Sequence, residues 1–173
     1  MISDSELVKG ALAGQKDAFG LLAERYAKAA RAVALNVCRD GHAASDIYQD
    51  ALLKAYHGLA TLRKPARFGP WLMQITRRCA LDHVKRQSKT TGLRPESPDQ
   101  LLPGRNGELD KDNAELLAAV MKLGCSERQV VMLRYFAQNS VRDVAKILDR
   151  SVGTVTKQLS RAHKRLKKIL TEA

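Results

Sequence analysis

The sequence has little of what β-rich or membrane-spanning proteins need. Aromatic residues make up only 5% of its 173 residues, and alternating runs rich in valine, isoleucine and threonine are absent. This absence argues against an all-β sandwich or barrel. No uninterrupted apolar run approaches the roughly 18–20 residues of a membrane-spanning helix, so we expect no membrane insertion.

Cysteine and histidine are scarce and scattered. Cys38, Cys79 and Cys125 form no C-x-x-C pair, and the four histidines show no zinc-ligand spacing. We therefore predict no metal and no cofactor, and interpret all three cysteines as small core hydrophobes in a reducing compartment. The polar, acidic start of the chain does not resemble a signal peptide. Together these observations predict a cytoplasmic protein.

Positive charge and apolar side chains are abundant. Apolar residues make up 45% of the chain, and 30 Lys and Arg against 18 Asp and Glu give a net charge of +12. The apolar fraction is sufficient for a packed core. The excess of cations points to a polyanionic partner: DNA, RNA or an acidic membrane surface.

The spacing of apolar residues predicts an all-α fold of two small helical domains joined by a flexible linker. In residues 1–87, apolar side chains recur every three or four positions, with a break from Lys64 to Pro70. Residues 88–112 are polar and hold three of the five prolines, which is typical of a linker. Residues 113–173 form the second domain.

The second domain is predicted to be a four-helix, winged-helix-like unit that contains a helix-turn-helix. Ser126 can cap one helix running to about Ala137, and Ser140 can cap a short helix ending near Leu148. A tight turn at Asp149 then leads into a long final helix.

Two basic clusters indicate nucleic-acid contact. In the final helix Lys157, Arg161 and Lys164 follow one face, and no acidic residue lies between Arg150 and Lys168. A solvated basic face near a helix C-terminus is the alternative interpretation. The other cluster, residues 63–89, surrounds aromatic side chains that can stack on unpaired bases at about 1–3 kcal/mol per base, or can simply belong to the core.

An acidic cluster contrasts with this positive charge. Asp46, Gln49 and Asp50 share one helix face at positions i, i+3 and i+4. The cluster is either a solvated face or a docking surface for a basic protein partner.

These motifs together resemble the extracytoplasmic-function (ECF) sigma factors, two-domain specificity subunits of bacterial RNA polymerase. The D-x-x-Q-[DE], F-x-x-W-L and A-L-D-x-x-R-R patterns of that family correspond to residues 46–50, 68–72 and 80–86. In the second domain, residues 133–135, 144–145 and 152–155 correspond to its L-R-Y, [IV]-A and VGTV segments. The resemblance covers nearly the whole chain apart from the linker.

The resemblance implies a role for each cluster. Sigma region 2, here the first domain, would bind the β′ clamp helices of core polymerase through Asp46, Gln49, Asp50 and Leu53. It would recognise and melt the minus-ten element, holding the non-template strand through Leu62, Arg63, Lys64, Arg67, Phe68, Trp71, Arg77 and Arg78. Region 4, the second domain, would bind the duplex minus-thirty-five element through Thr154, Thr156, Lys157, Ser160, Arg161 and Lys164.

The resemblance also implies partners and departures. The chain would also bind the β flap of core polymerase. When free it would be a monomer, and an anti-sigma factor would regulate it. Arg78, Thr156 and Gln158 replace residues usual in the family, so the direct readout of promoter bases is expected to be unusual.

Three other classes of function fit the sequence less well. A stand-alone helix-turn-helix regulator would share the second domain but would not need the acidic face. A nuclease would need clustered carboxylates for metal ions, for which Asp46 and Asp50 lack a third ligand. A basic membrane-surface protein would have to expose the apolar face that the final helix needs for its own core. We therefore expect no enzyme.

Overall fold

The computed structural model describes residues 2–91, 116 and 118–171. All regular secondary structure in these ranges is helical, as expected for an all-α fold. None of the described helices is both long and apolar enough to cross a membrane.

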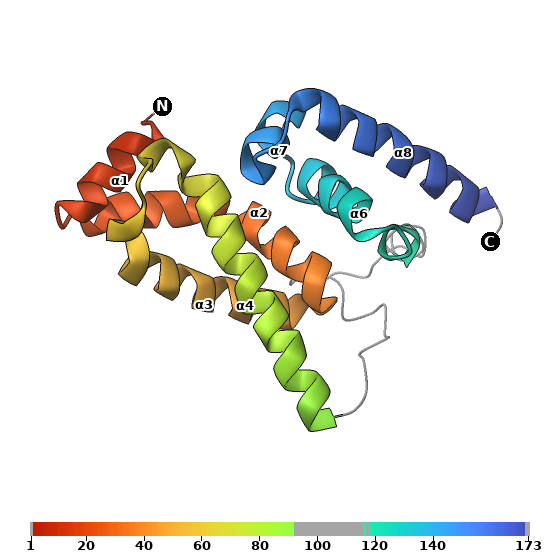
Figure 1. Cartoon of the computed structure of the whole chain (residues 1–173), viewed down its shortest axis with the longest axis horizontal. Coiled ribbons are helices and arrows are strands. Elements are labelled where there is room, and N and C mark those ends of the chain that lie inside the picture. Colours follow the sequence, from red (N-terminus) through yellow and green to blue (C-terminus); the bar gives the residue numbers. More distant parts are fainter. Residues whose placement is uncertain (1, 92–115, 117, 172–173) are drawn as a thin grey trace.

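The first unit is a bundle of helices (Figure 1). Its elements are α1 (Asp4–Leu12), α2 (Lys16–Cys38), α3 (Gly41–Gly58), η1 (Leu59–Thr61), η2 (Pro65–Arg67) and α4 (Phe68–Thr91). Ser3 caps α1 in a capping box with Glu6, whose carboxylate accepts from the Ser3 N–H. Helices α2, α3 and α4 pack pairwise around fully buried side chains such as Leu22, Val33 and Leu72.

The start of α4 lies close to α2. The break expected from Lys64 to Pro70 ends earlier, because α4 begins at Phe68 and accommodates Pro70 in its first turn, where no helical N–H is needed. A Cβ on Gly69 would lie 2.7–2.9 Å from the ring and hydroxyl of Tyr26. The Tyr26 hydroxyl donates to Asp4 of α1, so one ring connects three helices.

The second unit contains the helix-turn-helix that the sequence predicts. Its elements are α6 (Cys125–Val131), a π-helical turn η4 (Met132–Phe136), α7 (Val141–Leu148) and α8 (Val152–Thr171). Ser140 caps α7 in a capping box with Asp143. Asp149 adopts the left-handed conformation at φ 53°, which makes the tight turn before α8. Both of these sequence predictions are confirmed.

One capping expectation for the second unit is wrong: the N-cap of α6 is Gly124 rather than Ser126. The helix itself runs as far as expected, because the π-helical turn continues it to Phe136 and Ala137 is its C-cap. Cys38 and Cys79 are buried, but Cys125 is exposed at the start of α6 and is not a core residue.

The expected domain boundaries remain a prediction. Helix α4 continues to Thr91 and so includes the first four positions of the expected linker, 88–91. Positions 92–112 of the expected linker lie outside the described residues.

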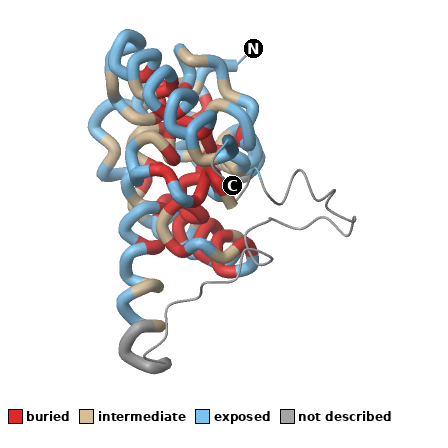
Figure 2. Tube along the Cα trace, turned by 90° about the vertical axis from the view of Figure 1, so that its right-hand side faces the viewer, coloured by how far each residue is buried: buried red, intermediate tan, exposed pale blue. Residues whose placement is uncertain are grey.

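The two units pack against each other. Helix α2 contacts α6 and η4, and α4 contacts α7. The buried apolar residues of both units form one continuous core, and Figure 2 shows where the buried positions lie along the chain.

Candidate nucleic-acid interface

The acidic face of α3 is exposed to solvent. Asp40 begins the helix by accepting from the backbone N–H groups of His42 and Ala43 at 2.8 and 3.0 Å. One side of α3 is buried against the bundle. The opposite side exposes every residue predicted for polymerase docking: Asp46, Gln49, Asp50 and Leu53.

Leu53 adds an exposed apolar side chain to this acidic face. It is 61% exposed and therefore contributes little to the core. Tyr56, one turn further on, is 48% exposed, and its ring meets Phe19 edge-on at 5.1 Å. The sequence reasoning missed Tyr56, although its spacing of i+3 from Leu53 was a usable signal. An exposed apolar patch beside carboxylates is more typical of a protein-binding surface than of a surface that faces only solvent.

The loop before α4 presents the predicted minus-ten residues. Arg63, Lys64 and Arg67 are exposed, and Leu62 is half-buried. With Trp71 and other neighbours they line an open cleft of about 290 Å³. A cleft with cations at its rim and an indole in its wall can hold a flat, negatively charged ligand.

The two aromatic residues of this segment differ in exposure. Phe68 is fully buried, with its ring 5.8 Å from that of Tyr26, so it presents no face to a ligand here. Trp71 is half-buried and lines the cleft. On α4 itself, Arg77 and Arg78 are both exposed.

The exposed face of α8 is basic from its first half onward. Its other face buries Val155, Leu159, Ala162 and Leu166, as the apolar periodicity predicts. All six candidate residues are exposed: Thr154, Thr156, Lys157, Ser160, Arg161 and Lys164.

The hydroxyl groups at the start of α8 are partly occupied by the helix itself. The Ser151 hydroxyl accepts from the Thr154 N–H at 3.1 Å, and Thr156 donates to the Val152 carbonyl at 2.9 Å. Gln158 accepts from Arg150 at 3.1 Å. The long cations further along α8 therefore remain the strongest candidates for DNA contact.

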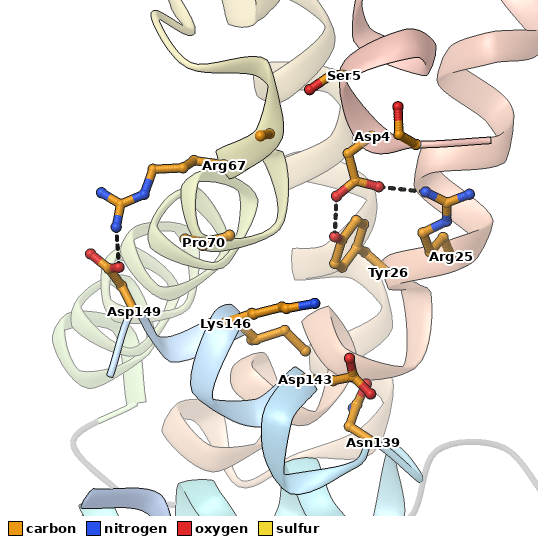
Figure 3. A pocket seen from close by; sticks show the side chains of 13 residues that line it. Asp4, Ser5, Arg25, Tyr26, Arg67, Pro70, Asn139, Asp143, Lys146 and Asp149 are labelled. Carbon is orange, nitrogen blue, oxygen red and sulfur yellow. Dashed lines mark hydrogen bonds and ion pairs between the residues drawn. The ribbon is translucent and has the colours of Figure 1, made fainter. Parts of the chain in front are cut away.

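The loop before α4 and the helix-turn-helix meet across a cleft of about 530 Å³ (Figure 3). Arg67 donates to Asp149 in an ion pair that links the loop to the turn before α8. On the other side of the cleft, Asp4 accepts from both Tyr26 and Arg25. Burial, with a smaller contribution from Asp4, raises the pKa of Tyr26, so its hydroxyl stays protonated and donates.

A helical bundle with an exposed acidic face, followed by a helix-turn-helix whose last helix has a basic exposed face, is the arrangement expected of a transcription initiation factor. Comparison with known families agrees: sigma-70 region 2 matches residues 22–90 and sigma-70 region 4 matches residues 113–166. The chain belongs to the ECF group of the sigma-70 family.

Individual relatives carry the same description. The chain is 32% identical over 161 residues to a probable RNA polymerase sigma factor, RfaY, of Xanthomonas campestris, covering 88% of this chain and 40% of that protein. It is 29% identical over 168 residues to the ECF sigma factor SigM of Mycobacterium tuberculosis, covering 97% of this chain and 85% of that protein.

Solved structures agree on the fold. The complex of CnrH with the cytosolic domain of CnrY matches at 24% identity and a TM-score of 0.67, over 98% of this chain and 97% of that chain. The sigma factor RpoE of Bartonella quintana, solved with the anti-sigma factor NepR, matches at 25% identity and a TM-score of 0.57, over 83% and 90%. The protein is thus an RNA polymerase sigma factor rather than a stand-alone regulator.

Proposed function

We propose that this sigma factor docks on the β′ clamp helices of core RNA polymerase through Asp46, Gln49, Asp50 and Leu53 of α3. The observation that carries the proposal is that all four are exposed on one helix face while the opposite face is buried. We add Tyr56 to this docking face because it is exposed and lies one turn beyond Leu53.

Region 2 then captures the non-template strand of the minus-ten element. Cations of the loop and of α4 follow the phosphates: Arg63, Lys64, Arg67, Arg77 and Arg78. The cleft beside Trp71 is the site for an unpaired base, and Leu62 forms part of its wall. Phe68 supports this site from within the core rather than by stacking on DNA, because it is fully buried.

Region 4 reads the minus-thirty-five element in duplex form and also contacts the β flap. Helix α8 enters the major groove, where Lys157, Ser160 and Arg161 reach base edges, helped by Thr154 and Thr156. Lys164 lies further along the helix and binds phosphate.

The protein has no chemistry of its own in this scheme. It contributes binding energy and strand opening in the cytoplasm as a monomer when free, while the polymerase forms the bonds. A structural relative was solved in complex with an anti-sigma factor, which supports an anti-sigma factor as a regulator of this chain too.

In vitro transcription tests the proposal. Purified protein is added to bacterial core polymerase on a promoter library, and transcript starts are sequenced with and without it. We expect starts that share two upstream elements and that occur only with this protein. Failure to bind core polymerase at all would overturn the docking assignment; starts without a shared upstream element would overturn promoter recognition by region 4.

A further inference from the structure

One carboxylate connects the N-terminal helix to the rest of the first unit. Asp4, in the first turn of α1, accepts from the Tyr26 hydroxyl and from one Nη of Arg25 (Figure 3). The other Nη of Arg25 donates to the backbone carbonyl of Ile2 at 2.8 Å. The Asp4 side chain is 17% exposed, so its contacts are largely shielded from water and are stronger than on an open surface.

Helix α1 lies against the loop before α4, which presents cations of the proposed minus-ten site. The helix has two buried residues, Leu7 and Val8, and besides α2 it contacts η1, η2 and α4. Both η1 and η2 belong to the segment that leads into α4. The position of α1 on α2 therefore determines what this loop packs against.

The Tyr26 ring extends this connection to the wall of the cleft of about 290 Å³. It lies so close to Gly69 that a Cβ there would come within 2.7–2.9 Å, and its centroid is 5.8 Å from that of Phe68. The buried Phe68 ring in turn lies 5.9 Å from the ring of Trp71, which lines the cleft. Neither Asp4 nor Tyr26 lines this cleft, so any effect that they have on it passes through these neighbours.

The Tyr26 hydroxyl can hold the ring in place because it keeps its proton. Burial, with a smaller contribution from Asp4, raises its pKa, so near neutral pH the phenol donates and the carboxylate accepts. A hydrogen bond to an ionised acceptor is about twice as strong as one between neutral groups. A ring that is bound at its hydroxyl and packed along its side has little freedom, and this fixes the surface against which Gly69 and Phe68 pack.

We propose that Asp4 and Tyr26 are positioning residues for the capture of an unpaired promoter base. Together they hold the start of α4 so that the Trp71 indole stands ready in the cleft before DNA arrives. A site that is ordered in advance binds more tightly, because less conformational freedom is lost on binding. This inference rests on the proposed function, and it assigns to α1 a part in promoter melting although no residue of α1 touches DNA in it.

Two substitutions separate the hydrogen bond from the packing. Tyr26→Phe removes the hydroxyl and keeps the ring, while Asp4→Ala removes the acceptor. Each variant is assembled with core polymerase, and its affinity is measured for fork-junction DNA whose minus-ten non-template strand is single-stranded. The DNA is taken from a promoter that the wild-type protein uses in the transcription assay above. Glu24→Gln, which changes a carboxylate to an amide at an exposed position of α2, is the matched control.

We expect Tyr26→Phe to lower the affinity for the fork by on the order of tenfold, which corresponds to one hydrogen bond to a charged group. In the Asp4→Ala background the same substitution should change the affinity by less than about twofold, because its acceptor is already gone. Affinity for core polymerase should stay the same in all variants. Circular dichroism checks that each variant is folded.

The single tryptophan of the chain gives a second measurement in the free protein. Tyr26→Phe and Asp4→Ala should make Trp71 fluorescence easier to quench with acrylamide, because the indole is then held less firmly in the cleft. The Glu24→Gln control should be quenched like the wild type. This readout needs neither polymerase nor DNA.

Three outcomes would overturn the positioning role. The first is unchanged affinity for the fork together with unchanged Trp71 quenching. The second is an equal loss of affinity for core polymerase, which would make the hydrogen bond a support of the whole fold. The third is an equal effect of Tyr26→Phe with and without Asp4. A failure of the proposed function differs from all three, since the wild-type holoenzyme itself would then not bind the fork.

Discussion

The exposed faces of α3 and α8 use the same helical spacing for opposite purposes. On α3, carboxylates at positions 46 and 50 are followed by an exposed leucine and tyrosine. On α8, cations at positions 157, 161 and 164 recur with no acidic side chain anywhere from Arg150 to Lys168. Both helices bury their other faces in the core.

The difference fits the two kinds of partner that we propose for these faces. A protein partner gains affinity from a few apolar side chains that lose all contact with water, and charge around them sets orientation. A nucleic acid gains affinity from repeated cations on phosphates, and its binding weakens as salt rises. The predictions below test whether changes on α3 affect only polymerase binding and changes on α8 affect only DNA binding.

The largest effect is expected from reversing charge on α3. Asp50→Arg should reduce affinity for core polymerase by about a hundredfold or more, because like charges then meet across the interface. Affinity is measured by fluorescence anisotropy with labelled sigma factor. Glu24→Arg, the same kind of reversal at an exposed position of α2, is the matched control and should bind normally. Equal losses in both variants would contradict a local docking face.

A smaller effect is expected on α8. Arg161→Ala should weaken binding of holoenzyme to minus-thirty-five duplex by about tenfold, since a good base contact contributes about 1–3 kcal/mol. Core polymerase binding should not change. Lys122→Ala, an exposed lysine of region 4 outside α8, is the control. Unchanged promoter affinity for Arg161→Ala would contradict its assignment to the recognition helix.

Lys164→Ala should change the salt dependence of DNA binding and leave the preference for promoter sequence unchanged. Losing one phosphate contact should lower the slope of log affinity against log salt by about 0.9. The measurement is a salt titration of holoenzyme on two promoters that differ in the minus-thirty-five element. A loss confined to one of the promoters would instead make Lys164 a base-reading residue.

The smallest effect, on the free energy of unfolding, is expected from the solvent-exposed ion pair that joins the two units. Arg67 and Asp149 have side chains that are 55% and 52% exposed, so Asp149→Asn should change the free energy of unfolding by less than about 1 kcal/mol. Asparagine also tolerates the left-handed turn. Thermal unfolding measures the change, and a loss well above this value would mean that this pair stabilises the packing of the two units more than an exposed ion pair usually does.

The sequence predicts well whatever depends on local chemistry. Ser140 with Asp143 three residues later identifies the start of α7, and Asp149 identifies a turn that needs a left-handed residue. The apolar stripe of α8 likewise follows from helical periodicity. Each of these signals lies within one or two helical turns.

What the sequence does not reveal depends on distant partners. Phe68 sits in a basic segment that resembles a stacking site, but α2 supplies Tyr26 to enclose its ring. Cys125 was predicted to be buried because cysteine usually is, yet it begins a helix at the junction of two units. The buried hydrogen bond that Arg128 donates to Asn36 joins residues 92 positions apart, and no local spacing predicts it.

The close approach of Gly69 to Tyr26 has a consequence for how this family can vary. A methyl group at position 69 would lie too close to the tyrosine ring and hydroxyl, so alanine there would force the Tyr26 side chain to move. A smaller side chain at position 26 would open the space, but it would also remove the donor to Asp4. Positions 69, 26 and 4 should therefore covary among homologues as a group, with larger residues at 69 accompanied by a smaller residue at 26 and a freer choice at 4.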